Sequence, residues 1–238
     1  MRWTIYHKPE TGSTNADARA GSPGDVHVAD FQTAGRGRLD HRWLAPPGVN
    51  LMFSAVLDVA GHDPSEIATL PLVVGLAVVR ALQPLLEKSR AKLTLKWPND
   101  VLAGGLKLAG ILCELCDEKV VAGVGVNVNQ TSFAPEISDR ATSMALLTGR
   151  TFDRRMVLDK VLAELEGLHT RWGEVGFAAI HSELAGIDHL AGRMVSIWQT
   201  DADPAPVAGI CGGIQADGTL IVGSTRIYAG EAHVCSDA

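Results

Sequence analysis

The sequence predicts an α/β (α+β) protein with a largely antiparallel sheet, flanking helices and a small C-terminal barrel. Up to about residue 130, short runs rich in β-branched residues are separated by Gly, Asn and Pro, which is typical of strands joined by turns. Two segments, 64–88 and 153–172, instead carry apolar residues at helical spacing. From about residue 190 the chain returns to short strands separated by Asp, Gly and Pro.

The predicted elements begin as strand, turn and helix and continue as strands joined by tight turns. Ser13, Thr14 and Asn15 are helix-capping residue types and mark a helix start after the first strand. The expected strands before residue 130 cover 2–8, 25–34, 49–59, 92–97, 106–115 and 120–129, with a turn at NDVLAGG (99–105). The later helices cover 153–172 and 176–184.

Composition limits the possible partners. The net charge of -6 argues against general affinity for nucleic acid or anionic membrane, since both rely on basic surfaces. The N-terminal MRWTIYHKPETG has no apolar core of a signal peptide. The most apolar stretch, 67–86, is interrupted by Pro71, Arg80 and Pro84, so it predicts a buried helix rather than a membrane span. We therefore expect a cytoplasmic protein that binds neither nucleic acid nor membrane.

The four cysteines do not predict a metal site or a disulfide framework. Cys113 and Cys116 form a CxxC inside a strand-like run, where residues three apart point to opposite faces. No second CxxC or pair of histidines follows, as a structural zinc site requires. We expect buried or idle thiols.

A glycine-rich segment, QTAGRGRLDHRW (32–43), is the first candidate site. Its glycines let the backbone approach a ligand closely, and Arg36 and Arg38 supply fork-shaped donors to carboxylate or phosphate oxygens. The segment is not a dinucleotide fingerprint, because the third glycine of GxGxxG falls at Asp40, and the chain has no P-loop. An anionic ligand is implied, although solvated arginines in an ordinary loop give the same pattern.

Three further motifs each have a functional and a structural interpretation. KWPND (96–100) places a cation and polar side chains at a strand end, but it also fits a local proline turn. Lys107 is a lone cation in an apolar strand, so its ammonium must find an anion or reach water. GVGVNVNQ (123–130) offers Asn127 and Asn129 for hydrogen bonding, or is a glycine-bearing strand packed against a helix.

The combination of these motifs is much more specific than its parts. STN (13–15), QTAGRGR (32–38), KWPND (96–100), KLAGIL (107–112) and GVGVNVN (123–129), in this order and spacing, closely resemble biotin protein ligases, that is biotin–[acetyl-CoA-carboxylase] ligases. The resemblance covers nearly the whole chain. It implies a class II synthetase-like mixed sheet flanked by helices in a catalytic domain at 1–187, followed by an SH3-like β-barrel at 188–238.

The resemblance also implies roles for individual residues. It places Ser13, Thr14, Asn15 and Gln32 around the biotin rings, and it matches Arg36, Gly37 and Arg38 to the loop that closes over biotin and its adenylate. Lys107 matches a lysine near the biotin carboxylate and the adenylate phosphate, which makes Lys107 and Arg38 the expected catalytic residues. Asn127 matches a position near the adenosine, and Asn99 is expected to help hold phosphate or metal.

The implied reaction has two halves. Biotin reacts with MgATP to give biotinyl-5′-AMP and pyrophosphate, and a lysine of a biotin carboxyl carrier domain of acetyl-CoA carboxylase or a related carboxylase then displaces AMP. Biotin, ATP and Mg²⁺ are the expected small molecules, with the metal carried mainly by the ATP phosphates. This chemistry needs no protein nucleophile, in agreement with the lack of a convincing nucleophilic triad. The expected assembly is a monomer or weak homodimer.

Two departures from the family pattern modify these expectations. The loop continues with Leu39, Asp40 and His41 where many relatives have a further basic residue and a glycine, so loop closure is expected to differ unless Asp40 points away or pairs with Arg42. The chain starts at the first catalytic strand, so we expect no DNA-binding role. A lipoate or octanoate ligase, and a non-catalytic biotin-binding protein, are the alternatives.

Overall fold

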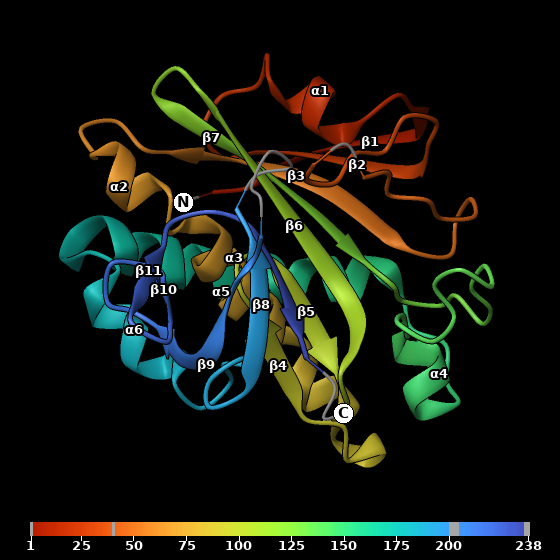
Figure 1. Cartoon of the computed structure of the whole chain (residues 1–238). Helices are drawn as coiled ribbons and strands as arrows, with labels where there is room; N and C mark the ends of the chain where they lie inside the picture. The colour runs from red at the N-terminus through yellow and green to blue at the C-terminus, as the bar shows by residue number, and fades with distance from the viewer. Residues whose placement is uncertain (1, 40, 200–204, 236–238) are drawn as a thin grey trace.

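The structure is a computed structural model that describes residues 2–39, 41–199 and 205–235. Its largest element is a seven-stranded sheet in the order β1-β2-β3-β7-β6-β5-β4 (Figure 1). The strands are β1 (Thr4–Thr11), β2 (Asp25–Gln32), β3 (Leu51–Asp58), β4 (Leu93–Lys96), β5 (Asp100–Ala103), β6 (Leu106–Cys116) and β7 (Lys119–Val126). Only β1 and β2 pair in parallel among these neighbours, so the predicted mixed sheet is confirmed.

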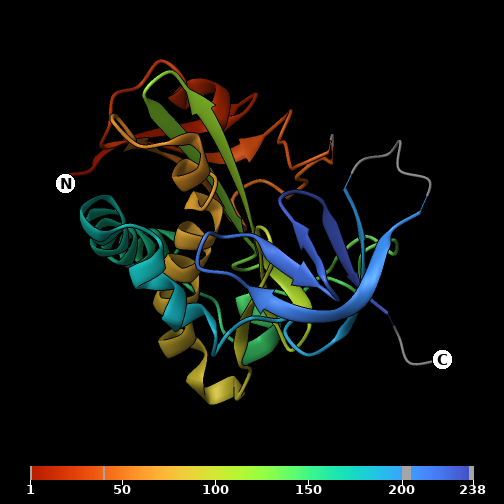
Figure 2. The ribbon, with the colours of Figure 1, turned by 60° about the vertical axis from the view of Figure 1, so that its left-hand side comes forward.

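Helices cover one face of this sheet and leave part of the other bare. The helical segments are α1 (Thr14–Ala18), α2 (Pro64–Ile67), α3 (Leu70–Leu82), the 3₁₀ helix η1 (Gln83–Ser89), α4 (Met144–Thr148), α5 (Arg154–Val175) and α6 (Ala178–Leu184). α3 packs against β4, β5 and β6, and α5 packs against α3 (Figure 2). α1 packs against β2, β3 and β7.

The apolar segment 64–89 is a core element. By length and composition it could cross a membrane, but 72% of its most apolar window is buried inside the protein, as the sequence predicted. The single helix expected at 64–88 is wrong in detail, because the segment divides into α2, α3 and η1. Pro71 and Pro84 lie in the first turns of α3 and η1, where the missing proline N–H costs no helical hydrogen bond.

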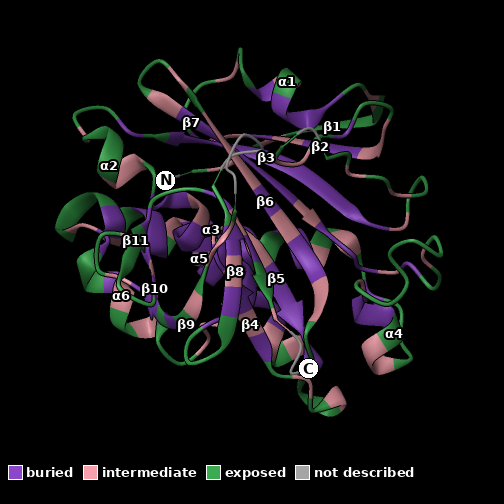
Figure 3. Cartoon of the chain, viewed as in Figure 1, coloured by how far each residue is buried: buried purple, intermediate pink, exposed green. Residues whose placement is uncertain are grey.

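Strand β3 is buried on both faces, which explains its continuous apolar sequence. Its odd-numbered residues, such as Phe53, join the main apolar cluster with α3 and α5. Its even-numbered residues point the other way, where Val56 packs with Ala18 of α1 and Val121 of β7. Figure 3 shows these central strands as buried, with exposed residues at the loops. Ser54 therefore faces α1.

The C-terminal part of the chain forms a second, five-stranded antiparallel sheet. Its order is β11-β10-β9-β8-β12, from β8 (Met194–Trp198), β9 (Val207–Ile214), β10 (Leu220–Val222), β11 (Thr225–Ile227) and β12 (Glu231–Val234). Trp97 donates its indole N–H to the Gly218 carbonyl at 3.0 Å, and His181 Nε2 donates to the Ile214 carbonyl at 2.6 Å. The small sheet is thereby fixed to the main one, while a domain boundary at residue 187 stays a prediction.

One predicted turn is wrong. The NDVLAGG segment contains strand β5, and only Gly104 and Gly105, both with positive φ, make the tight turn into β6. Val101, Leu102 and Ala103 are buried, and burial on the sheet decides the local structure.

Leu165 of α5 offers a direct test of this core. Its side chain has no exposed surface, so Leu165→Ala is expected to lower the free energy of unfolding by about 2–5 kcal/mol through lost apolar contacts and a residual cavity. Leu146→Ala is the matched control, because that helical leucine is 50% exposed and its truncation is expected to cost less than about 0.5 kcal/mol. Urea denaturation measures both, and equal midpoints would contradict the packing described.

Candidate functional site

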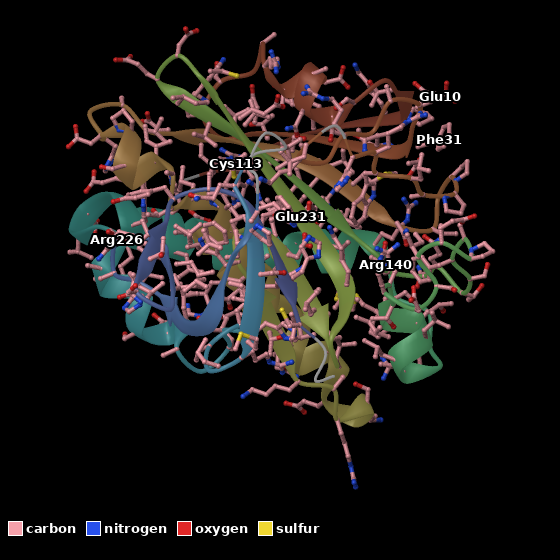
Figure 4. The ribbon with its side chains drawn as sticks, in the orientation of Figure 1. Glu10, Phe31, Cys113, Arg140, Arg226 and Glu231 are labelled. Atoms are coloured by element: carbon pink, nitrogen blue, oxygen red, sulfur yellow. The ribbon has the colours of Figure 1, made fainter. Side chains whose placement is uncertain are left out.

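A cleft opens on the sheet face opposite α3 and α5. Its cavity volume is about 140 Å³, or about 940 Å³ when the open solvent at its mouth is included. Strands β6 and β7 form its floor, and its walls come from the start of α1, the end of β2, the glycine-rich loop, the KWPND segment and β12. Glu231 of β12, labelled in Figure 4, shows that the small sheet contributes to this wall.

The floor of the cleft is made by glycines that face the same way on neighbouring strands. Gly110 of β6 pairs directly with Gly125 of β7, and Gly123 lies two residues earlier in β7. A Cβ at Gly123 would lie 2.1 Å from Asn15 Oδ1, and one at Gly125 would lie 2.5 Å from the Trp43 ring. These side chains can lie against the sheet only because the floor has no side chains of its own.

The glycine-rich loop folds as a short hairpin over this floor. Trp43 N–H donates to the Gly35 carbonyl at 3.0 Å, and Gly37 N–H donates to the His41 carbonyl at 2.7 Å. A Cβ at Gly35 would lie 2.5 Å from the Trp43 carbonyl oxygen, so the close approach of the two arms requires glycine there. Asp40, the unusual residue of this loop, lies outside the described residues.

A chain of neutral polar groups occupies one end of the cleft. The Thr14 backbone N–H and hydroxyl both contact Gln32 Oε1, at 2.7 and 3.0 Å. Ser54 Oγ lies 2.8 Å from Thr14 Oγ1 and 2.6 Å from Asn15 Oδ1. Ser54 is fully buried and was not predicted as a site residue, since a lone serine in an apolar strand has no distinctive sequence context.

Cations gather at the other end. Lys107 Nζ lies 2.7 Å from Asp100 Oδ1, so the lone strand lysine has the anion that the sequence required. Lys107 and Gly110 both line the cleft although they are three residues apart. The β6–β5 register shifts in this segment, so that Leu102 pairs with Lys107 and Val101 with Ala109. The extra residue turns Lys107 to the glycine face.

Burial shifts the pKa values of two cleft cations. It lowers the pKa values of Lys96 and Arg38, and the negative charges of Asp100 and Glu231 oppose both shifts. Arg38 also donates to the Gly230 carbonyl of the small sheet at 3.2 Å. The carboxylates compensate only partly for the lost hydration, so a bound anion would stabilise these cations further.

The KWPND segment divides its side chains between the cleft and the scaffold. Lys96 and Asp100 line the cleft next to Lys107, and Trp97, which also lines it, is almost fully buried and donates its indole N–H to the small sheet. Asn99 lines the cleft, but its side-chain amide donates to the Ile111 carbonyl at 2.7 Å. The backbone carbonyl of Asn99 accepts from the Ile111 N–H at 2.9 Å. Asn99 thus also extends the pairing of β6 beyond β5.

The cleft brings together nearly all the residues that the sequence singles out. Nine of them line it: Ser13, Thr14, Asn15, Gln32, Arg36, Gly37, Arg38, Asn99 and Lys107. Asn127 does not; it follows β7, is buried, and donates to the Thr142 carbonyl at 3.0 Å. Its nucleotide contact stays a prediction. Trp43, Lys96 and Glu231 also line the cleft and were not on the predicted set.

Charge and shape together define what the cleft can hold. Among its described lining residues are five cationic side chains, Arg36, Arg38, Arg42, Lys96 and Lys107, and two acidic ones, Asp100 and Glu231. The excess of cations occurs in a chain of net charge -6. An elongated ligand with a neutral hydrogen-bonding head and an anionic tail fits both ends.

The cysteines Cys113, Cys116, Cys211 and Cys235 are free in the structure, and their expected idleness stays a prediction. Cys113 and Cys116 are free and lie on β6, where Cys113 packs against the main apolar cluster and Cys116 against the smaller one. Within the described residues, no group of three or more His, Cys, Asp or Glu side chains is arranged to hold a metal ion.

Known proteins share this sequence and fold. Residues 11–130 match the biotin/lipoate A/B protein ligase family. Over 170 residues the chain is 42% identical to the biotin–[acetyl-CoA-carboxylase] ligase of Mycobacterium tuberculosis, covering 68% of this chain and 63% of that protein. The ligase of the same name from Paracoccus denitrificans is 34% identical, with 89% and 91% covered. The structure of biotin protein ligase from Aquifex aeolicus in complex with biotin and ATP has a TM-score of 0.85 at 31% identity, over 97% and 99% of the chains.

Coverage differs among these relatives. The chain spans less than two thirds of the length of the M. tuberculosis protein, but nearly the full length of the P. denitrificans and A. aeolicus proteins.

The environment of Cys113 predicts its reactivity. Burial and the neighbouring charge of Glu114 raise the pKa of its thiol to about 12. Because the thiolate is the nucleophile, iodoacetamide at pH 8 is expected to alkylate Cys113 about a thousandfold more slowly in the folded protein than in the urea-unfolded chain. Peptide mass spectrometry over a time course measures both rates. Comparable rates in the two states would contradict the burial of this thiol.

Proposed function

Because the chain belongs to the biotin/lipoate A/B protein ligase family, we propose that its cleft binds biotin and ATP and that the protein is an ATP-dependent biotin protein ligase. The observation that carries the proposal is the polarity of the cleft, with neutral donors and acceptors at one end and Arg38, Lys96 and Lys107 at the other. Biotin has the same polarity, since its ureido ring is neutral and its valeryl chain ends in a carboxylate.

The neutral end suits the ureido group. A ureido group offers two N–H donors and one carbonyl acceptor, and hydroxyl and amide side chains can satisfy both kinds. Thr14, Asn15 and Gln32 are already held in one hydrogen-bonded set. The glycine floor provides a flat surface for the fused rings beneath them. We assign the biotin rings to this end of the cleft.

The cationic end suits the first half-reaction. A biotin carboxylate oxygen bonds to the α-phosphorus of ATP, and the bond from that phosphorus to the bridging oxygen breaks, so that pyrophosphate leaves with its electron pair. The main obstacle is repulsion between the carboxylate and the polyphosphate. Lys107, Lys96 and Arg38 lower this repulsion and stabilise the charge that develops at phosphorus.

Mg²⁺ is expected to enter with the nucleotide. Such an ion is held mainly by phosphate oxygens and needs only one or two protein carboxylates, and Asp100 and Glu231 are the carboxylates among the described lining residues. When bound, the ion would neutralise phosphate charge. Asn99 and Asn127 remain the proposed polar contacts near the nucleotide.

The second half-reaction requires protection of a reactive intermediate. Biotinyl-5′-AMP is a mixed anhydride. The acceptor amine forms a bond to its carbonyl carbon, and the bond from that carbon to the AMP oxygen breaks. AMP leaves with the electron pair of that bond, and the amine loses a proton. Water competes for the same carbon. Arg36, Gly37 and Arg38 lie on the hairpin over the cleft, and Arg38 also reaches the small sheet. We assign these residues to retention of the adenylate.

Several finer assignments belong to the same proposal. The acceptor is a lysine of a biotin carboxyl carrier domain of acetyl-CoA carboxylase or a related carboxylase, and the reaction takes place in the cytoplasm without nucleic acid or membrane. The protein acts as a monomer or weak homodimer. Residues 188–238 form an SH3-like domain that completes the catalytic cleft of residues 1–187.

Pyrophosphate release provides the test of this function. Purified protein with MgATP is expected to release pyrophosphate when biotin is added and not when lipoate replaces it, because lipoate lacks the ureido group. Mass spectrometry of the enzyme complex should then show biotinyl-5′-AMP. Release with lipoate instead would support a lipoate ligase, and biotin binding without release would leave a non-catalytic binding protein.

Two cleft cations are expected to fail in different ways. Lys107→Ala should slow adenylate formation by about 10²-fold, because it removes a charge beside the reacting phosphate. Arg38→Gly should mainly shorten the retention of biotinyl-5′-AMP, so that free adenylate accumulates and acylates lysines indiscriminately. Single-turnover kinetics and labelling of bovine serum albumin separate the two effects. An identical loss of biotin affinity in both variants, with no other change, would refute this division of roles.

A further inference from the structure

Glu114 joins three segments that surround the neutral end of the cleft. Its side chain projects from β6 with 16% of its surface exposed. Oε2 accepts a hydrogen bond from Asn15 of α1 at 2.7 Å. Oε1 accepts from Arg19, just after α1, at 2.7 Å and from Arg36 of the hairpin at 3.2 Å. One carboxylate therefore connects the helix start, the glycine-rich loop and the sheet.

The carboxylate determines how the Asn15 amide is oriented. An ionised carboxylate only accepts hydrogen bonds, so the NH₂ group of Asn15 must face Glu114. The same NH₂ group also reaches the Leu112 carbonyl at 3.3 Å. Asn15 Oδ1 is then directed to Ser54 Oγ at 2.6 Å. This oxygen lies directly against the backbone of Gly123, where a Cβ would lie 2.1 Å from it.

This orientation sets the direction of the whole polar chain. The Ser54 hydroxyl has one proton, which goes to Asn15 Oδ1 when that oxygen faces it. The one proton of the Thr14 hydroxyl is then shared between Ser54 Oγ at 2.8 Å and Gln32 Oε1 at 3.0 Å, because neither oxygen has a proton left to donate to it. The Thr14 oxygen keeps its lone pairs, and Thr14 lines the cleft, so it offers an acceptor to a ligand N–H.

Glu114 stays ionised over the range in which the chain must work. Burial alone would raise its pKa, but hydrogen bonds from Asn15 and Arg19 and the charges of Arg19 and Arg36 keep that pKa below the ordinary value. The carboxylate thus remains an acceptor at neutral pH.

We propose that Glu114 is a positioning residue for recognition of the ligand's ring end, acting through Asn15, Ser54 and Thr14. It does not touch the ligand; it fixes the donor direction of the chain that does. The inference rests on the proposed function, because the ring end is taken to be the ureido group of biotin. If Glu114 only held α1 against the sheet, the loss of Arg19 would have the same effect as the loss of Glu114. The contacts of Glu114 with Asn15 and with Arg19 both connect α1 and the residue after it to β6.

The decisive variant is Glu114→Gln, which preserves size and removes the charge. A glutamine can present its own NH₂ group to Asn15, so the Asn15 amide turns over and the polar chain loses its direction. We expect the biotin KM to rise about tenfold, while kcat for pyrophosphate release and the ATP KM stay within about twofold. Arg19→Ala is the matched control, because Arg19 binds the same carboxylate but does not line the cleft, and its biotin KM should stay within about twofold of wild type.

A second variant protects the test against a general loss of folding. Ser54→Ala breaks the same chain one step closer to Thr14, so its effect on the biotin KM should not multiply with that of Glu114→Gln in the double variant. A purely structural Glu114 would give independent effects and a lower Tm without a selective change in biotin KM.

The outcomes separate the inference from the function on which it rests. If wild-type protein shows biotin-dependent pyrophosphate release but Glu114→Gln leaves the biotin KM unchanged, or Arg19→Ala matches its effect, the positioning role is overturned and the proposed function stands. If wild-type protein shows no such release, the proposed function fails, and this inference with it.

Discussion

The cleft depends on one constraint, the lack of side chains on one face of β6 and β7. Gly110, Gly123 and Gly125 fall on that face because residues alternate along a strand and because the two strands pair Gly110 with Gly125. A Cβ at Gly123 would collide with Asn15 and one at Gly125 with Trp43, and a Cβ at Gly110 would lie 3.1 Å from Lys107 Cε. A shift of one residue would move these three glycines to the helix-covered face and put apolar side chains such as Ile111 and Val124 on the floor. Eight residues of β3 pair with β7, and this pairing is buried against α3 and α5. The pairing therefore fixes which β7 residues face the cleft as well as which ones face the core.

A second consequence of this arrangement is the separation of charge along the cleft. The neutral chain of Gln32, Thr14 and Ser54 lies where β2, α1 and β3 meet. Lys96, Asp100 and Lys107 come from β4, β5 and β6, which lie toward the other edge of the same sheet. A regular strand would not have placed both Lys107 and Gly110 on one face. The register shift between β5 and β6 makes this possible, and Leu108 and Ala109 between them are both buried in the core. A local irregularity of one strand thus brings a cation to the edge of an otherwise flat floor.

Much of this could be predicted from the sequence, and the exceptions have physical reasons. The strands, the long α5 and most site residues were expected because alternation, helical spacing and the ordered set of motifs are local signals. The single helix at 64–88 and the turn at 99–105 were wrong, because prolines divide the first and burial turns part of the second into β5. Ser54 and Glu114 gave no signal, since each gains its importance from partners 39 and 99 residues away in sequence. Asn127 lies outside the residues that line the cleft and donates to the Thr142 carbonyl, while its nucleotide contact stays a prediction.

The small C-terminal sheet also takes part in the cleft through backbone as well as side chains. Arg38 is held by the Gly230 carbonyl, and Glu231 next to it faces the same cations. Gly230 has a positive φ, and a Cβ there would lie 2.7 Å from the Trp198 carbonyl, so the chain can bring this carbonyl to the hairpin only with glycine at the start of β12. The same sheet is fixed to the KWPND segment by the hydrogen bond of Trp97. Lys96 and Asp100 of this segment line the same cleft. The small sheet, which begins almost a hundred residues after KWPND, therefore fixes the hairpin and the cleft cations relative to one another. A change in the packing of this sheet would alter the cationic end of the cleft without touching any residue of its floor.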